Sequence, residues 1–256
     1  MCRQSIAIII DFENSEISVW YICSKMSVDT LRLKGYTVID NIYRPDEIDA
    51  ISQSIIHAST SKPTFRKTAD LFAIRQFLKE VPEVQPLIFN AKLNALIAEY
   101  IGSDYFVVKS IYFDKPEHSN WFVAWHQDLT ISVDKKLELP GFGHWTVKQD
   151  QYAVQPPLGI LENIFTIRIH LDDTNEENGA LRVIPGSHLR GVYRHSSKES
   201  VHEEEICQVK SGGIMIMQPL LQHASNRTVS RNRRRVIHIE FSNVKLHQGL
   251  EWAELL

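Results

Sequence analysis

The chain has 256 residues, of which 43% are hydrophobic, and this is enough for a sizeable buried core in a single domain. Its formal net charge of −3 gives no field that would attract nucleic acid or an anionic membrane surface, so we expect a small-molecule partner. Three sparse cysteines argue against a disulfide framework or a zinc site and favour a reducing cytoplasm; they are Cys2, Cys23 and Cys207.

Residues 1–26 are a candidate extension that precedes a single domain over residues 27–256. Their apolar run from Ile6 to Ile10 is interrupted by Asp11 and Glu13, so it is too short for the core of a signal peptide. No longer apolar run in the chain predicts a transmembrane helix.

The first part of the domain, residues 27–104, is predicted to be mainly helical. Proline suits a first helical turn, and after Pro45 the isoleucines recur at helical spacing. Two further apolar runs predict two more helices, the second of which Gly102 ends. The predicted elements are a short helix that ends at Gly35, a strand over Tyr36–Ile39, and helices over Asp46–Ile56, Leu71–Lys79 and Pro86–Ile101.

From Tyr105 onward, short β-rich runs separated by turn residues indicate a barrel or sandwich, and we assign the β core to residues 105–245. Prolines and glycines between Lys135 and Gly159 predict a long irregular insertion, which in a compact domain is usually functional or disordered. The predicted strands include Phe106–Phe113, Phe165–Leu171, Leu181–Ile184, Ile214–Gln218 and Arg235–Phe241.

Alternate side chains of a strand point to opposite faces, and this divides two of the predicted strands into an apolar and a polar face. Ile167 and Ile169 share one face, whereas Arg168 and His170 share the other. The apolar faces are expected to pack on the helices. The polar faces either line a pocket or are simply solvated, as in many antiparallel sheets. In the last strand the polar face holds Arg234, His238 and Glu240.

The triplet His126-Gln127-Asp128, with His223 far downstream, is the strongest chemical signal in the chain. Two imidazoles and one carboxylate on one face of a metal are the ligand set of non-haem iron(II) oxygenases, which keep the remaining positions open. A triplet of this form arises by chance about once in such a chain, and His170-Leu171-Asp172 also has it. The second triplet precedes the turn signal Asn178-Gly179, so a strand-end role explains it without a metal.

Three segments in this order make the chain recognisable: WHQDLTISV, HLDDTNEENGALRVIPGSH and LLQHASNRTVSRNRRRVIHIEF. Together they resemble the phytanoyl-CoA dioxygenase family, and the resemblance covers residues 31–243. It implies a mainly β fold, a double-stranded β-helix (jelly-roll, cupin-like) core with flanking N-terminal helices. It also implies Fe(II), 2-oxoglutarate and O2, with His126, Asp128 and His223 as the metal ligands.

The resemblance further implies hydroxylation of a small molecule with release of succinate and CO2. Halogenating relatives replace the metal-binding carboxylate with a small residue, so Asp128 favours hydroxylation. In the family an arginine after the distal histidine binds the remote carboxylate of 2-oxoglutarate, and this position falls on Arg234. Arg233 and Arg235 are adjacent, but Arg234 shares a strand face with His238 and Glu240.

Weaker alignment with the same family adds Lys109, Thr130 and Ser225 as cosubstrate contacts. Trp145, His144 and Arg168 are candidates for substrate contacts, although a structural role explains each of them equally well.

Two other functions use the same residues. A cupin-like metal-dependent isomerase or hydrolase would use the three ligands without O2, and a noncatalytic binding module would keep the metal as a structural ion. The resemblance does not fix the substrate, because one fold hosts many activities, and no basic adenine-binding patch for a coenzyme A thioester is visible in the chain.

Overall fold

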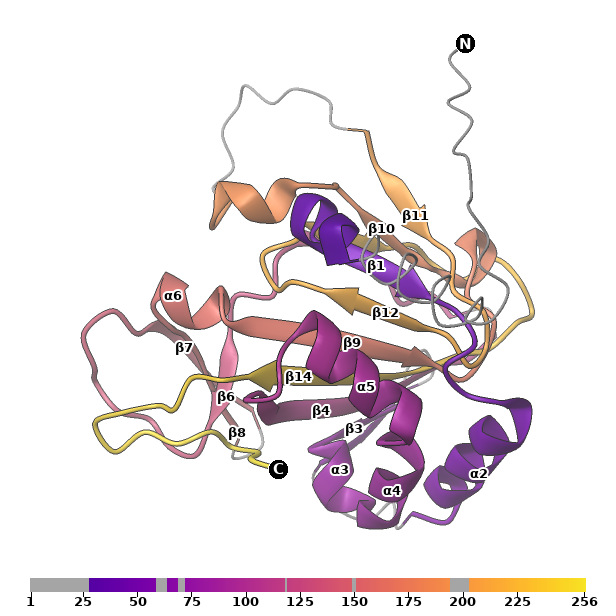
Figure 1. The fold of residues 1–256 in the computed structure, drawn as a ribbon, viewed down its shortest axis with the longest axis horizontal. Coiled ribbons are helices and arrows are strands. Elements are labelled where there is room, and N and C mark those ends of the chain that lie inside the picture. Colours follow the sequence, from indigo (N-terminus) through magenta and orange to yellow (C-terminus); the bar gives the residue numbers. More distant parts are fainter. Residues whose placement is uncertain (1–27, 59–63, 69–71, 118, 149–150, 194–202) are drawn as a thin grey trace, which may run out of the picture.

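The computed structural model of the chain is a jelly roll, in which a larger and a smaller antiparallel sheet face each other (Figure 1). The fold class expected from the resemblance is thereby confirmed. The candidate extension over residues 1–26, with Cys2, Cys23 and the run from Ile6 to Ile10, lies outside the described residues. The structure describes residues 28–58, 64–68, 72–117, 119–148, 151–193 and 203–256.

The larger sheet has seven strands, and every neighbouring pair in it is antiparallel. The predicted strands of the second half of the chain are confirmed, with ends that move by one or two residues. In spatial order the strands are β1 (Tyr36–Ile39), β12 (Ile214–Met217), β9 (Ile164–His170), β14 (Arg234–Ser242), β4 (Phe106–Lys115), β3 (Phe72–Arg75) and β2 (Phe65–Lys67).

Two smaller sheets complete the β structure. The four-stranded sheet faces the larger one across a buried apolar cluster that includes Leu181, Val183, Met215 and Met217. Its strands are β11 (Glu205–Cys207), β10 (Leu181–Val183), β13 (His223–Ser225) and β5 (Val123–His126). The three-stranded sheet consists of β6 (Ile131–Val133), β8 (Gln151–Gln155) and β7 (Gly143–Lys148).

The helices of the first half of the chain cover the outer face of the larger sheet (Figure 1). Residues 28–34 are helical, and none of the described helices is long and apolar enough to cross a bilayer. The helices are α2 (Pro45–Ile56), α3 (Phe77–Glu80), α4 (Gln85–Ile88), α5 (Ala91–Tyr100) and α6 (Leu158–Leu161), with 3-10 turns η1 (Pro82–Val84), η2 (Glu176–Asn178) and η3 (Ser187–Arg190).

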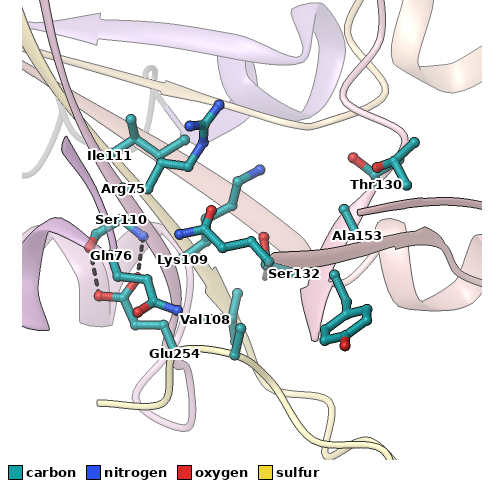
Figure 2. A pocket seen from close by; sticks show the side chains of 14 residues that line it. Arg75, Gln76, Val108, Lys109, Ser110, Ile111, Thr130, Ser132, Ala153 and Glu254 are labelled. Atoms are coloured by element: carbon teal, nitrogen blue, oxygen red, sulfur yellow. Dashed lines mark hydrogen bonds between the residues drawn. The ribbon is translucent and has the colours of Figure 1, made fainter. Parts of the chain in front are cut away.

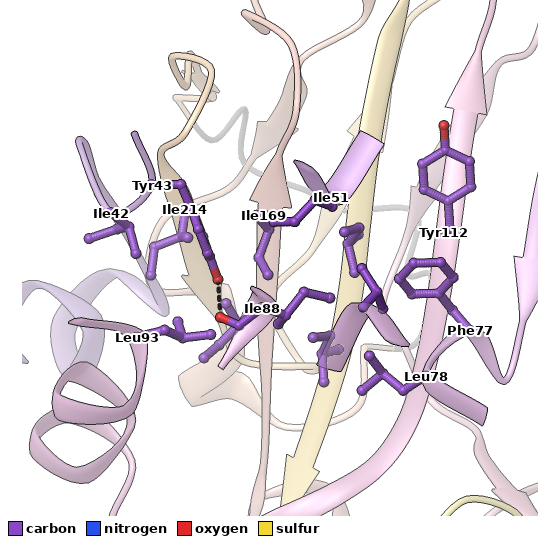
Figure 3. Packing of buried hydrophobic residues seen from close by; sticks show 14 of the residues in the cluster. Ile42, Tyr43, Ile51, Phe77, Leu78, Ile88, Leu93, Tyr112, Ile169 and Ile214 are labelled. Atoms are coloured by element: carbon purple, nitrogen blue, oxygen red, sulfur yellow. Dashed lines mark hydrogen bonds between the residues drawn. The ribbon is translucent and has the colours of Figure 1, made fainter. Parts of the chain in front are cut away.

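One row of cross-strand partners forms the centre of the core beneath these helices (Figure 3). The row runs across five strands, and each of its side chains is at most 2% exposed. Full burial of an aliphatic side chain of this size is worth about 1.5–3 kcal/mol, so the row holds the sheet and helices together. Its members are Ile74, Tyr112, Ile237, Ile169 and Ile214.

The helix predicted over Leu71–Lys79 is wrong over its first half. Phe72–Arg75 forms strand β3, which pairs with the edge of β4, and only Phe77–Glu80 is helical. Gln76 stands between them in a left-handed conformation, with φ of 51°. A short apolar run can form either a helix or a strand, and here the edge of β4 provides backbone hydrogen-bond partners for a strand. The N-terminal third is therefore less helical than predicted.

Two further predictions need correction. The segment between Lys135 and Gly159 is not irregular, because strands β7 and β8 form a hairpin there that pairs with β6. The helix predicted over Pro86–Ile101 is two helices, α4 and α5. The chain turns between them because the Asn90 side chain accepts a hydrogen bond from the Leu93 backbone N–H and so begins α5.

Gly212 marks a close approach of two backbones. Its carbonyl accepts hydrogen bonds from the backbone N–H groups of Ile42 and Tyr43, and a Cβ on it would lie 2.4 Å from the Tyr43 carbonyl oxygen. Gly212 has φ of +80°, and the exposed Gly249 has φ of +81° with open space around it.

We therefore expect Gly212→Ala to destabilise the protein more than Gly249→Ala. The backbone conformation alone costs about 1–2 kcal/mol in each variant, and the clash with Tyr43 adds about 1–3 kcal/mol in the first. Urea unfolding of both variants measures the difference. Equal losses of stability would show that the close approach to Tyr43 is not a constraint.

Candidate metal centre

Three predicted ligand side chains converge beside the last two strands of the four-stranded sheet. Strands β5 and β13 pair so that His126 and His223 are direct cross-strand partners, and their ring centroids lie 4.2 Å apart. Asp128 follows two residues after His126, and its carboxylate oxygens lie 3.7 Å from Nε2 of each ring. One ligand atom from each residue lies within 4.8 Å of the others, which fits a single metal ion.

Both histidines are oriented by their second ring nitrogen. Nδ1 of His126 lies 2.9 Å from the Ala124 carbonyl oxygen, and Nδ1 of His223 lies 2.9 Å from that of Leu221. The carbonyls can only accept, so each Nδ1 carries the proton and each Nε2 presents a lone pair. This is the tautomer that a metal ligand needs.

The charge state of the cluster also suits a metal. Burial lowers the pKa of His223 to about 4, so its ring is neutral at neutral pH. Burial alone would raise the pKa of Asp128, but His223, His238 and Lys109 together hold that pKa well below its usual range. The cluster therefore offers the neutral imidazole of His223 and a carboxylate beside the imidazole of His126, and two imidazoles with one carboxylate are the set typical of an open non-haem iron site.

Gln127 fixes the backbone between His126 and Asp128. Its side-chain amide nitrogen donates to the carbonyls of Leu220 at 2.6 Å and Gly191 at 2.9 Å, and its amide oxygen accepts from the Tyr193 backbone N–H at 2.7 Å. These bonds tie the triplet to the segment before β13 and to the loop after η3. The Asp128 backbone N–H donates to the Pro219 carbonyl on the same segment.

A cavity of about 160 Å³ adjoins the three side chains. Part of its wall is apolar and helps to exclude water, and Trp121 packs against Phe113 there with ring centroids 5.9 Å apart. The rest of the polar wall, beside the three side chains and Ser225, comes from the inner face of the larger sheet, so the polar face predicted from strand alternation lines a pocket and is not simply solvated. The apolar residues are Ile111, Phe113, Trp121, Val123 and Leu181.

A chain of hydrogen bonds crosses the inner face of this sheet. Lys109 Nζ donates to Glu240 Oε1 at 2.7 Å, and His238 Nε2 lies 3.0 Å from the same oxygen. Arg168 Nη1 lies 3.2 Å from His238 Nδ1. Since a guanidinium only donates, Nδ1 accepts and the Nε2 proton points to Glu240, which is consistent with the lowered pKa of buried His238. Lys109, predicted to contact the cosubstrate, is thus held by Glu240.

Arg234 and Lys115 form a second group of buried cations. Arg234 is a cavity residue, and its Nη1 donates to the Gly179 carbonyl, to which Ser225 Oγ also donates at 2.8 Å. Lys115 is the cross-strand partner of Arg234, is 1% exposed, and donates to the Asn226 carbonyl at 2.6 Å. Neither cation has a carboxylate partner among the described residues.

Lys115 is not among the residues predicted from the sequence. The alternation of side chains along β4 predicts its orientation. Lys115 lies on the same strand face as Lys109 and Ile111, which line the cavity. The strand predicted from the sequence ends at Phe113, two residues before Lys115. The prediction therefore leaves out Lys115, the cross-strand partner of Arg234.

The neighbours of Arg234 have other partners. Arg233 makes two hydrogen bonds to the carboxylate of Asp114. Arg235 binds the carboxylate of Asp172 through its backbone N–H at 2.8 Å and through its guanidinium at 2.7 and 2.9 Å. Among the three adjacent arginines, Arg234 is the one that lines the cavity.

The second triplet has a structural role. Asp172 is occupied by Arg235, and His170 Nδ1 lies 2.7 Å from the Thr174 hydroxyl. Among the described residues, the group that can hold a metal consists of the first triplet's His126 and Asp128 with His223.

A second cavity, of about 190 Å³, adjoins the first, and Lys109 and Ile111 line both (Figure 2). Thr130 lines this second cavity, not the one around the metal ligands. The three residues predicted to contact the substrate do not lie together. Arg168 lines the first cavity, whereas His144 and Trp145 line neither cavity. Trp145 packs against the apolar cluster beneath the three-stranded sheet, and His144 is exposed.

A family comparison agrees with this geometry. The family model of phytanoyl-CoA dioxygenase (PhyH) matches residues 31–236. The chain belongs to the phytanoyl-CoA dioxygenase family. The match includes His126, Asp128, His223 and Arg234, and it ends near the start of β14.

Relatives of this phytanoyl-CoA dioxygenase family member share its fold. A probable alpha-ketoglutarate-dependent hypophosphite dioxygenase from Stutzerimonas stutzeri is 24% identical over 181 residues, which are 65% of this chain and 54% of the relative. The chain thus spans about half the length of this curated relative. EctD from S. alaskensis in its apoform has a TM-score of 0.65 at 18% identity, covering 87% of this chain and 79% of EctD.

Another similar structure is the epimerase SnoN in complex with Fe3+, alpha ketoglutarate and nogalamycin RO. Its TM-score is 0.64 at 11% identity, with 87% of this chain and 84% of SnoN covered. At these identities the structural likeness supports the jelly-roll fold.

The residues around the cavity fit Fe(II) and a dicarboxylate cosubstrate. The ligand atoms are two imidazole nitrogens and a carboxylate, and Nε of Arg168 and of Arg234 are buried without a hydrogen-bond partner among the described residues. Lys115 adds a third buried cation. Buried cations of this kind are stabilised when an anion binds beside them.

Lys115 gives a prediction for the ligand-free protein. Burial, with a smaller contribution from Arg234, lowers the pKa of Lys115 to about 7, whereas the unfolded chain keeps the ordinary value near 10.4. The unfolded state therefore binds more protons between these values. The stability of the native protein rises with pH across this window, and the full burial cost applies below about pH 7.

We expect Lys115→Met to stabilise the ligand-free protein most below about pH 7 and progressively less towards about pH 10. The exposed Lys245→Met is the matched control and should show no such pH dependence. Urea unfolding across this range measures both variants. A gain of stability that grows with pH would contradict the burial of a charged Lys115.

Proposed function

We propose that the protein is an Fe(II)- and 2-oxoglutarate-dependent dioxygenase that hydroxylates a small molecule and releases succinate and CO2. The observation that carries the proposal is one cavity that is lined by both the His126, Asp128 and His223 cluster and the buried Arg234. Buried Lys115 is the cross-strand partner of Arg234, and neither cation has a carboxylate partner among the described residues. Family membership supports the same chemistry. The overall reaction uses O2, with one oxygen atom entering the product and the other entering succinate.

The protein's own residues have separate tasks. His126, Asp128 and His223 would hold Fe(II), and a site with three protein ligands would leave room for 2-oxoglutarate and O2. Arg234 binds the remote carboxylate of 2-oxoglutarate, because its planar fork can donate two parallel hydrogen bonds. Ser225 and Lys115 lie beside it and assist. When bound, Fe(II) supplies the electron-transfer chemistry by which O2 reacts with 2-oxoglutarate and the substrate.

The sequence predicts cosubstrate contacts for Lys109 and Thr130, and we propose a further task for each. Lys109 is held by Glu240 at the boundary of the two cavities, and Thr130 lines the second cavity. We assign Lys109 to shaping the potential beside Asp128, and Thr130 to the side from which a substrate approaches.

We also propose a cellular compartment and a size class for the substrate. The sparse cysteines favour the cytoplasm, and Cys207 is a free, buried thiol. We propose a small molecule as the substrate, because the cavities measure about 160 and 190 Å³.

The ligand assignment is tested by exchanging one aspartate in each triplet. We expect Asp128→Ala to lose Fe(II) binding and 2-oxoglutarate turnover, because the metal loses its only carboxylate. Asp172→Ala should bind Fe(II) normally but lose about 1–3 kcal/mol of stability, because Arg235 is left without its acceptor. Metal titration, succinate release and urea unfolding measure these effects. Full turnover by Asp128→Ala would refute the assignment.

The cosubstrate site is tested by comparing two adjacent arginines. Anaerobic protein with Fe(II) and 2-oxoglutarate should show the weak visible charge-transfer band of the chelate. We expect Arg234→Met to weaken 2-oxoglutarate binding by about 10- to 100-fold, since charge-assisted hydrogen bonds are lost. Arg233→Met removes the same charge but affects a pair with Asp114, so it should bind 2-oxoglutarate like the wild type.

Other outcomes favour the alternative functions. Bound Fe(II) with no band on addition of 2-oxoglutarate would favour a noncatalytic metal-containing module. Activity that persists under strictly anaerobic conditions would favour a cupin-like isomerase or hydrolase.

A further inference from the structure

The second cavity has no role in binding the metal or 2-oxoglutarate as proposed above. Arg234 and Ser225 line the first cavity only, whereas Thr130, two residues after Asp128, lines the second. Lys109 and Ile111 line both, so the two cavities share these side chains as a common wall. A molecule in the second cavity would therefore lie on a different side of Lys109 than 2-oxoglutarate.

Arg75 is the distinctive residue of this cavity. It lies at the end of β3, where its cross-strand partner is Ile111, and Ile111 is in turn the partner of His238. Cross-strand partners project from the same face of a sheet, so Arg75 points to the inner, polar face. In Figure 2 the Arg75 and Lys109 side chains extend to the same side, away from the pair formed by Ser110 and Glu254.

The guanidinium of Arg75 has no carboxylate partner among the residues that the structure describes. It is half-buried, and burial, together with the nearby charge of Arg66, lowers its pKa. Other arginines of the protein do have such partners: Arg44 binds Asp46, Arg182 binds Glu204, Arg233 binds Asp114 and Arg235 binds Asp172.

The carboxylates near the cavity have other partners. Glu254 accepts hydrogen bonds of 2.6 Å from both the backbone N–H and the hydroxyl of Ser110, and burial raises its pKa. Glu240 is held by Lys109 and His238. The cavity therefore has an unbalanced positive charge at Arg75. The remaining polar residues that line it are neutral hydrogen-bonding groups: Gln76, Thr130, Ser132, Thr146, Gln151 and Tyr152.

We propose that the second cavity is the substrate site and that Arg75 binds an oxyanion group of the substrate. The substrate class is then a small polar molecule with a carboxylate or a phosphorus oxyanion, held so that its reacting bond lies at the Lys109 and Ile111 boundary. A guanidinium suits this task, since it binds a planar or tetrahedral oxyanion through two hydrogen bonds. This inference rests on the proposed function, because it names the substrate class of the same enzyme.

Two small oxyanions serve as probes, propionate for a carboxylate and hypophosphite for a phosphorus oxyanion. Each is titrated calorimetrically into protein loaded with Ni(II), which does not react with O2, and with saturating 2-oxoglutarate. We expect saturable binding of at least one probe to the wild type. Arg75→Gln should weaken it by about tenfold or more, as the loss of charge-assisted hydrogen bonds implies. The probe that binds identifies the kind of oxyanion.

Two further variants act as controls. Arg66→Gln removes the same charge from an exposed position on the neighbouring strand β2, and it should bind the probe within about twofold of the wild type. Arg75→Lys keeps the charge and should retain part of the affinity, which separates a loss of charge from a loss of folding.

Three results would overturn the inference: no saturable binding of either probe, equal binding by Arg75→Gln and wild type, or displacement of 2-oxoglutarate by the probe. The last would place the probe at Arg234. A wild type that binds Ni(II) but no 2-oxoglutarate would instead refute the proposed function, and titration of the probes without 2-oxoglutarate would still report on Arg75.

Discussion

The candidate site depends on the antiparallel register of β9, β14 and β4. In this register Ile237 and Ile239 face the helices, and Arg234 and His238 face the cavity. A slip of β14 by one residue would exchange the two sets. The slip would expose two isoleucines whose burial is worth about 1.5–3 kcal/mol each and would place charges in an apolar core. The hydrophobic packing on one face therefore determines which cations line the cavity on the other.

The cavity opposes the stability of the ligand-free fold. Lys115, Arg168 and Arg234 are buried, and burial is the main cause of the lowered pKa of each. A cation taken out of water without a carboxylate partner costs free energy, which the apolar core offsets. An anionic ligand that binds only the native state recovers part of this cost, so ligand binding and folding stability are coupled. Buried charges without a partner of opposite charge are expected at a functional site.

The sequence predicts the parts of the site that depend on strand alternation and short spacing. It predicts that His126 and Asp128 of the first triplet lie together with the distal His223, and it predicts the polar face with Arg168 and His238. It misses features that depend on distant pairing. A run as short as Phe72–Arg75 does not distinguish a period of 2 from one of 3.6, and the edge of β4 decides its conformation. Likewise, the pairing of Lys109 with Glu240 follows from a register between strands that are far apart in sequence.

The position of Lys109 explains how two anions can bind near one metal. In the proposed arrangement, 2-oxoglutarate occupies the first cavity and an anionic substrate occupies the second. Two negative charges at short range repel strongly where water is excluded. Lys109 lines both cavities and interacts electrostatically with Asp128, which lines the first, and with Arg75, which lines the second. Because Glu240 holds its ammonium at the boundary, Lys109 reduces this repulsion without itself occupying either binding position.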